Sequence, residues 1–196
     1  MRKTSDTVDG RVRRSERSRA AMVQALFDLV GSGELQPTAQ QVARRAKVGI
    51  RTVFRHFSDM DSLLAELNER VRERALPLIQ EPPTRGSRDE RARGLVAQRV
   101  RFYEQIAPYK RSGNLQRARS DFLASEHARL VRTLRANLLR WLPELERSPE
   151  LVDALDAMTS FEVWDRMRND QRLGRERAAA ALERTVLALI ATLGRA

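Results

Sequence analysis

The sequence predicts an all-α protein with about nine helices. Apolar residues recur at helical spacing along most of the chain, long β-branched runs are missing, and aromatic residues make up only 5% of the 196 positions. Prolines, glycines and polar capping residues divide the chain into segments of helical length. A hydrophobic content of 41% is enough to form a core.

The first third of the chain is expected to hold three helices and the start of a fourth. Residues 1–14 are polar and basic, which predicts an N-terminal arm, and Ser15 can cap the first helix. The glycines of "GSGELQP" suit the end of that helix. Thr38 can cap a second helix, and a break at 47–49 separates it from a third at 50–57.

A fourth helix and a linker complete the expected first domain. Ser58 and Asp61 have the spacing of a capping box at the start of the fourth helix. The sequence "QEPPTRGS" at 80–87, with two prolines and a glycine, is the clearest linker. We therefore expect one domain at 15–75 and a second helical domain at 82–196.

Five further helices are expected in the second part of the chain. Ser87 precedes one that Pro108 is expected to end, and a short helical segment follows it. Ser125 is expected to open the next helix, and Ser148 to cap the one after it. The break at 171–176 precedes the last helix.

Positive charge is concentrated near the N-terminus. The chain has 37 basic and 26 acidic residues, a net charge of +11. Residues 1–57 hold 12 basic and 5 acidic residues, a net of +7, which leaves +4 for the remaining 139 residues. This excess fits a polyanionic partner, and a basic surface that only aids solubility is the alternative.

Several classes of protein are disfavoured by what the sequence lacks. Without cysteine, neither a disulfide nor a Cys-ligated metal site can form. No stretch approaches the ~20 apolar residues of a membrane span, and no signal peptide is recognised, so we expect a cytoplasmic protein. Phosphate-loop and nucleophile motifs are missing, and the two histidines, His56 and His127, do not suffice for a triad or zinc site. We expect no catalytic residues, metal or cofactor.

Residues 38–57 have the pattern of a helix-turn-helix, two short helices joined by three residues. The small core between them is expected to consist of Val42, Ala43, Ala46, Val48, Val53 and Phe57. Helical periodicity divides the second helix into an apolar face and a donor-rich face. The apolar face consists of Ile50, Val53, Phe54 and Phe57, and the donor-rich face consists of Arg51, Thr52, Arg55 and His56. The donor-rich face has no carboxylate, as a surface that meets phosphates requires.

Individual donors on these helices suit individual parts of DNA. Arg51 can donate two parallel hydrogen bonds to N7 and O6 of guanine. Thr52 and His56 can reach phosphate oxygens, or Thr52 a thymine methyl. Thr38 places the N-terminus of the helix that it caps against the DNA backbone. The alternative is an ordinary solvated, arginine-rich surface helix.

The stretch "PTAQQVARRAKVGIRTVFRHFSDMDSLL", residues 37–64, resembles the DNA-binding domain of TetR-type transcriptional regulators. The family pattern reads roughly T-x-x-x-I-A-x-x-A-G-V-S-x-x-T-[LV]-Y-x-[HY]-F-x-x-K-x-x-L. The residues in register with it are Thr38, Val42, Ala43, Ala46, Val48, Thr52, Val53, Arg55, His56, Phe57, Leu63 and Leu64. The resemblance covers about residues 15–75, and "SFEVWDRMR" with the Ala-rich segment after it resembles the family's last two helices.

Four positions depart from the family pattern. Lys47 replaces the glycine of the turn, and Gly49 replaces the serine that caps the recognition helix. Phe54 replaces a tyrosine, and Met60 replaces a lysine, that usually contact phosphate. These departures imply weaker DNA binding or greater reliance on the arm. The DNA-binding candidates are Thr38, Lys47, Gly49, Ile50, Arg51, Thr52, Phe54, Arg55 and His56.

The resemblance also implies a C-terminal domain that dimerises through its last two helices and encloses a small-molecule site. Candidates for the dimer interface are Leu155, Met158, Leu182, Val186 and Leu189. Candidates for the pocket lining are Phe102, Tyr103, Phe122, Trp141, Phe161 and Trp164. For each of these residues, a place in the intramolecular core is the alternative.

The expected function is that of a homodimeric, ligand-responsive transcriptional regulator. Its partners would be a double-stranded DNA operator and a small, largely apolar effector that releases a repressor from the operator. The alternative is a constitutive helical DNA-binding dimer whose C-terminal core is filled. An enzyme is disfavoured by the missing motifs.

Overall fold

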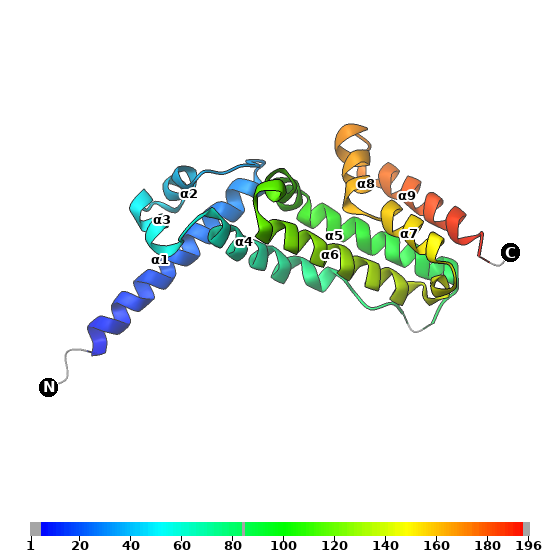
Figure 1. Ribbon diagram of the computed structural model, residues 1–196, viewed down its shortest axis with the longest axis horizontal. Helices are drawn as coiled ribbons and strands as arrows, with labels where there is room; N and C mark the ends of the chain where they lie inside the picture. Colours follow the sequence, from blue (N-terminus) through cyan, green and yellow to red (C-terminus); the bar gives the residue numbers. More distant parts are fainter. Residues whose placement is uncertain (1–4, 84, 194–196) are drawn as a thin grey trace. The chain divides into compact units, whose positions relative to one another are not determined.

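The computed structural model describes residues 5–83 and 85–193, and it is built from helices (Figure 1). The prediction of an all-α fold is confirmed, and the described residues contain nine α-helices, some separated by short 3-10 or π-helical turns. The α-helices are α1 (Ser5–Gly31), α2 (Ala39–Ala46), α3 (Ile50–His56), α4 (Met60–Ala75), α5 (Arg88–Gln116), α6 (Asp121–Trp141), α7 (Pro149–Met158), α8 (Phe161–Asp165) and α9 (Arg175–Ile190).

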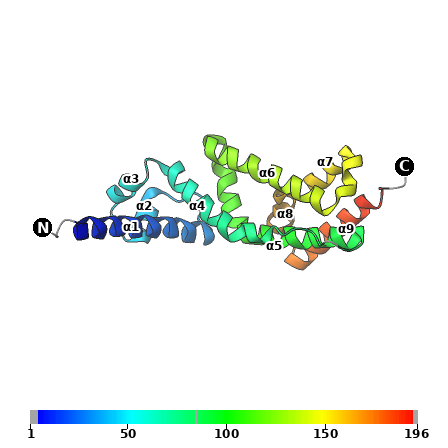
Figure 2. The ribbon, with the colours of Figure 1, turned by 90° about the horizontal axis from the view of Figure 1, so that it is seen from below.

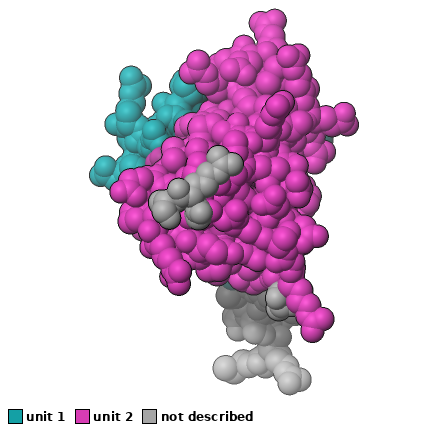
Figure 3. Space-filling model, turned by 90° about the vertical axis from the view of Figure 1, so that its right-hand side faces the viewer, with its two compact units in different colours: residues 1–74, 108–124 teal, residues 75–107, 125–196 magenta. Residues whose placement is uncertain are grey.

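The helices form two compact units (Figure 3). The N-terminal unit comprises residues 1–74 and 108–124, and the C-terminal unit comprises residues 75–107 and 125–196. The second half of the chain therefore supplies part of the N-terminal unit, which the expected boundaries did not include. No helix in the described ranges is long and apolar enough to cross a membrane.

Pro108 lies inside α5, so the prediction that it ends a helix is wrong. A proline removes one backbone N–H from the helical ladder, but contacts of the residues after it can offset that cost. The Tyr109 ring stacks on Phe27 of α1, with ring centroids 4.7 Å apart. The Ser112 hydroxyl donates to the carbonyl of Leu35 at 2.7 Å. These contacts fix the end of α5 within the N-terminal unit.

The first helix begins ten residues before the expected cap at Ser15. Figure 2 shows α1, in blue, as one continuous helix, and its first residue is Ser5. Arginine, which helped to predict an arm, is a good helix former, and its side chain can bond to the helix itself. The Arg14 Nε donates to the carbonyl of Gly10 at 3.2 Å, for example. The rest of the predicted arm, residues 1–4, lies outside the described residues.

The start of α4 is capped by a residue pair other than the expected one. The Asp59 carboxylate accepts the backbone N–H of Ser62 at 2.8 Å, and the Ser62 hydroxyl donates back to the Asp59 carbonyl at 2.8 Å. The cap therefore begins one residue after Ser58. Asp61, the expected partner of Ser58, instead accepts a hydrogen bond from Ser120 at 2.9 Å.

The start of α6 also differs from the expectation. The Ser120 hydroxyl accepts the backbone N–H of Leu123 at 3.2 Å, and α6 begins at Asp121 rather than at Ser125. Because Ser120 also bonds to Asp61 of α4, this cap ties the start of α6 to the N-terminal unit.

The core of the N-terminal unit gathers the apolar faces of α1 to α4. Its members include Met22, Leu26 and Val30 of α1, Val42 and Ala43 of α2, Val53 of α3 with Phe57 after it, and Leu63, Leu64 and Leu67 of α4. This core fixes α2 and α3 against the longer helices, which leaves the outer sides of both short helices in solvent.

Candidate nucleic-acid interface

The start of α2 has the capping box that Thr38 predicts. The Thr38 hydroxyl accepts the backbone N–H of Gln41 at 3.2 Å, and the Gln41 side chain accepts the backbone N–H of Thr38 at 2.7 Å. Such reciprocal bonds satisfy two donors that the first turn of a helix would otherwise leave open. The Thr38 side chain is therefore engaged in the cap, although it is exposed.

The turn between α2 and α3 is closed by Lys47 in the left-handed conformation, with φ 56° and ψ 41°. Its backbone N–H donates to the carbonyl of Arg44 at 3.2 Å, and the N–H of Val48 donates to that of Ala43 at 3.0 Å. These bonds use carbonyls that the end of α2 leaves without helical partners. The left-handed conformation favours glycine, the residue of the family pattern at this position, but here a lysine adopts it.

Lys47→Gly is expected to stabilise the protein by up to about 1 kcal/mol, because a side chain in the left-handed region is strained and glycine is not. In a chain of this length, the melting temperature should rise by about 2–4 °C, measured by thermal denaturation. Lys47→Ala is the matched control, since it removes the charge but keeps the Cβ. Equal melting temperatures for the two variants would contradict the assigned strain.

The start of α3 has no side-chain cap. Gly49 occupies the N-cap position with φ −73° and ψ 148°, and its carbonyl accepts the N–H of Thr52 at 2.8 Å. With no side chain, Gly49 cannot supply the oxygen that a serine would place over the first turn. The backbone geometry of a capped helix is thus kept without the capping bond.

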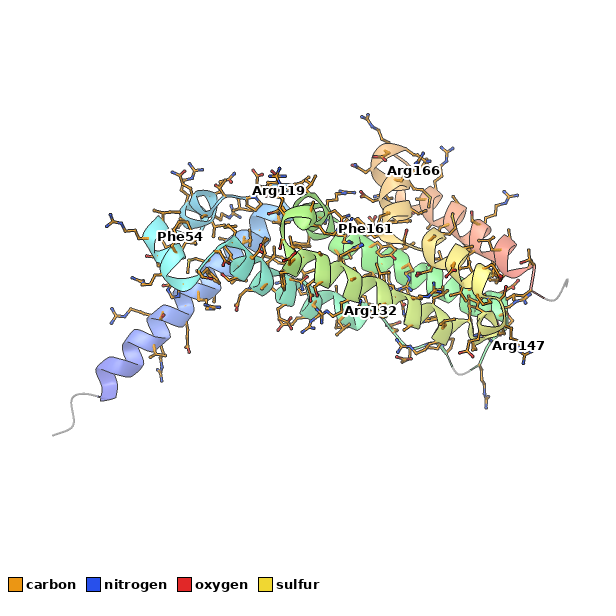
Figure 4. All side chains as sticks on the ribbon, in the orientation of Figure 1. Phe54, Arg119, Arg132, Arg147, Phe161 and Arg166 are labelled. Carbon is orange, nitrogen blue, oxygen red and sulfur yellow. The ribbon has the colours of Figure 1, made fainter. Side chains whose placement is uncertain are left out.

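The buried side of α3 is narrower than the periodicity predicts and is turned toward Thr52 and His56. Val53 and Phe57 are buried, as expected for the core, whereas 40% of Ile50 and 56% of Phe54 are exposed, so only two of the four residues on the apolar face are buried. Figure 4 shows Phe54 on the outside of α3. Thr52 and His56 are half-buried instead. The solvent-facing side of α3 therefore combines two apolar residues with the arginines.

Arg19 of α1 holds the end of α3, and the sequence pattern did not indicate this role. Its guanidinium donates to the carbonyl of His56 at 3.0 Å and pairs with Glu66 of α4 at 2.9 Å. It also lies over the Phe57 ring, 4.6 Å from the centroid. A cation at the C-terminal end of a helix is favourable. Arg19 thus fixes the end of α3 between α1 and α4.

The His56 side chain is less available than expected. Its Nε2 is buried and has no hydrogen-bond partner within the described ranges. Burial, followed by the charges of Arg55 and Arg19, lowers the pKa of this imidazole below its ordinary value of 6.5. The ring is therefore neutral near pH 7, and contact with a phosphate would require it to turn outward.

Because the His56 pKa is lower in the folded protein, the unfolded chain binds more protons just below pH 6.5. The melting temperature of the wild type should therefore fall as the pH drops from about 7 to about 5. His56→Gln should flatten this decrease, measured by thermal denaturation at several pH values. Parallel curves for the two proteins would show that His56 does not contribute.

Unpaired positive charge surrounds the turn. Arg44, Arg45, Lys47, Arg51 and Arg55 are all exposed. Of these five, only Arg45 forms an ion pair within the part of the chain that the structure describes, with Asp28 at 3.5 Å. The other four cations are available to an anionic partner, which agrees with the charge excess of the first third.

Two short helices around a tight turn, with exposed donors on the second, form a helix-turn-helix unit, the arrangement that many DNA-binding proteins use. Residues 36–67 match the family model described as "Bacterial regulatory proteins, tetR family". A search of curated proteins finds no match to the chain.

Solved structures extend this similarity to the fold of both units. The chain is similar to a transcriptional regulator from Rhodococcus sp. Rha1, with 23% identity and a TM-score of 0.64 over 90% of this chain and 95% of that one. It is also similar to a TetR-family transcriptional regulator from Streptomyces coelicolor, with 16% identity and a TM-score of 0.71 over 92% and 83%. The resemblance to TetR-type regulators is thus confirmed, in the sequence of the helix-turn-helix and in the fold.

The pocket candidates are divided between the units. Phe122 is half-buried and belongs to the N-terminal unit, whereas the other five are buried in the C-terminal unit. The Tyr103 ring lies 5.7 Å from Phe102 and 5.7 Å from Phe161, between centroids, and its hydroxyl donates to the carbonyl of Thr159 at 2.6 Å. Trp164 donates to Glu104 at 3.1 Å. The pocket itself stays a prediction.

The interface candidates differ in their exposure. Leu155, Leu182 and Val186 are buried within the single chain, which favours the alternative of intramolecular core for these three. Met158 and Leu189 are half-buried and keep some surface for a partner. The dimer interface thus also stays a prediction.

Gly94 of α5 lies directly against the Trp141 ring, and a Cβ at this position would come closer than van der Waals contact to it. Gly94→Ala should therefore destabilise the protein by about 1–3 kcal/mol. Gly113 is the control in the same helix, because a Cβ there meets nothing within 4 Å. Gly113→Ala should stabilise by about 0.5–1 kcal/mol. Chemical denaturation measures both, and the same sign for both would contradict the close packing of Trp141.

Proposed function

We propose that the protein is a homodimeric transcriptional repressor that binds a DNA operator through α3 and is released by a small effector. The observation that carries the proposal is the outer side of α3, where Arg51 and Arg55 are exposed and have no ion pair within the described residues. This side has no carboxylate, so it can enter a major groove lined by phosphates without repulsion.

The parts of this surface suit different contacts. Arg51 is positioned one residue into the helix, where the N-terminal residues of a recognition helix meet base edges. Arg44 and Lys47 flank the turn as point charges for phosphates. Ile50 and Phe54 are exposed on the same helix and suit apolar contact with thymine methyls. Phe54 thereby exchanges the phosphate contact of a tyrosine for a contact with bases.

A two-fold dimer would present two copies of α3 to successive major grooves, about 34–36 Å apart or a multiple of that distance. The effector would act by binding one state of the protein better than the other, typically with about 1–3 kcal/mol of coupling. The alternative is a dimer that binds DNA constitutively. Its support is the burial of five aromatic candidates in the C-terminal unit.

Footprinting on the DNA upstream of the protein's own gene tests the proposal. We expect protection of two half-sites related by a two-fold axis, and loss of protection when Arg51 and Arg55 are both replaced by alanine. Arg132 of α6 is exposed and serves as the matched control (Figure 4), because Arg132→Ala should leave the footprint intact. A chain that protects no site and binds all DNA sequences equally would contradict the proposal.

A further inference from the structure

The C-terminal unit buries an arginine without a counter-ion. Arg99 of α5 is only 1% exposed. Its Nη2 donates to the carbonyl of Leu134 on α6 at 2.6 Å. Its Nε and Nη1 have no hydrogen-bond partner within the described residues. Three of the five guanidinium hydrogens therefore belong to nitrogens without an acceptor.

Acidic side chains near Arg99 do not neutralise it. No carboxylate of the described residues forms an ion pair with it, and Asp156 acts on it only at longer range. Asp156 is itself bound by Arg135, at 3.4 Å, which also pairs with Asp153 at 2.6 Å. Burial lowers the pKa of Arg99, but a guanidinium keeps its proton in proteins. Within the described residues this buried positive charge thus has no anionic partner, which is unfavourable unless a bound anion supplies one.

Aromatic side chains and one open acceptor lie one helical turn from Arg99 and from its partner Leu134. Tyr103 lies one turn further along α5 and contacts Phe102 and Phe161. One turn along α6 from Leu134, Asn137 is fully buried, and its Oδ1 also has no partner among the described residues. An interior of this kind suits a molecule with an apolar body and one anionic group.

We propose that Arg99 anchors the anionic group of the effector, and that the effector is therefore a small monocarboxylic acid with an apolar or aromatic body. One buried positive charge balances one negative charge, and a guanidinium matches the planar carboxylate. This inference rests on the proposed function, in which an effector enters the C-terminal unit. It narrows the expectation of a small, largely apolar effector to one that carries a single anionic group.

The test uses the full chain without DNA and compares acids with matched neutral amides. The probes are phenylacetate and octanoate, with phenylacetamide and octanamide as their uncharged counterparts. Binding is measured by thermal shift and by the fluorescence of Trp141 and Trp164, the two tryptophans of the chain, both in the C-terminal unit. We expect a concentration-dependent rise in melting temperature with at least one acid and no rise with its amide.

Two variants of Arg99 distinguish an anchor from a structural arginine. Arg99→Met should raise the melting temperature of the ligand-free protein, because it removes an uncompensated buried charge, and should weaken acid binding at least about tenfold. Arg99→Lys keeps a cation and should retain part of the acid response. Arg132→Met is the exposed control and should behave as the wild type.

Three results would overturn the inference: equal binding of acids and amides, no response to either acid, or an Arg99→Met variant that is less stable but still responds to acid. The last result would make Arg99 a structural tether between α5 and α6. The DNA footprint is read separately, so an intact footprint with no acid response removes only the acid site. An acid response without a footprint removes only the DNA-binding part of the proposed function.

Discussion

Phe57→Ala is expected to lower the free energy of unfolding by about 3–5 kcal/mol, the usual cost of truncating a buried phenylalanine. Only 2% of Phe57 is exposed, and its ring lies in the core that joins α3 to α1 and α4, beneath Arg19. The substitution removes the ring, leaves a cavity and also removes the cation–π contact. Chemical denaturation measures the loss, and hydrogen exchange of the α3 amides locates it.

Phe54→Ala is the matched control, three residues earlier on the same helix. Because 56% of Phe54 is exposed, its truncation should change the free energy of unfolding by no more than about 0.5 kcal/mol. Its effect should instead appear in DNA binding, as a weaker preference at A·T pairs. Similar losses of stability for the two variants would mean that α3 is buried on both sides, contrary to its observed orientation.

Local signals in the sequence were enough to predict the turn itself. Thr38 acts through bonds to Gln41, three residues away, so its cap follows from nearby residues alone. The left-handed conformation of Lys47 was implied instead by the resemblance, whose pattern has a glycine at this position. The N-cap position of Gly49 and the break after α3 are local in the same way. The fold class was predictable for the same reason, because helical periodicity is also local.

The orientation of α3 could not be predicted locally. Arg19 is 37 residues from His56 and 47 residues from Glu66, and its contacts hold the end of α3 from outside the stretch whose pattern predicts the helix. Pro108 is a similar case. The contacts that stabilise α5 after Pro108 are made with Phe27 of α1 and with Leu35, which follows α1. Tertiary contacts overrode local preference in both places.

Arg99 was missed because a pattern of apolar residues counts an arginine as exposed. A signal was nevertheless present in the sequence. Val96, Val100 and Tyr103 define the apolar side of α5, and Arg99 lies three residues after the first and four before the last of them. A charged residue at helical spacing within an apolar stripe indicates burial, and with it a need for a counter-ion.

Arg51→Ala is expected to weaken operator binding by about 1–3 kcal/mol per half-site, and to do so selectively. The side chain is exposed, lies near the start of α3 and has no ion pair within the described part of the chain, so in the free protein nothing competes for its guanidinium. A bidentate contact with guanine would be lost, and with it the preference for G·C at one position of each half-site. Thermal stability should stay within about 0.5 kcal/mol of the wild type, since no packing contact is removed.

Binding titrations against the operator and against variants with that base pair changed measure the selectivity. For the wild type, each change should cost affinity, whereas for Arg51→Ala all four base pairs at that position should bind alike. Arg44→Ala provides the contrast, because Arg44 is exposed beside the turn at the end of α2. Loss of a phosphate contact should weaken binding equally on all sequences and reduce the salt dependence by about one unit of log–log slope per half-site. If Arg51→Ala instead weakens binding equally on all sequences, Arg51 contacts phosphate. The contacts with base edges would then come from Ile50 or Arg55, on the same exposed side of α3.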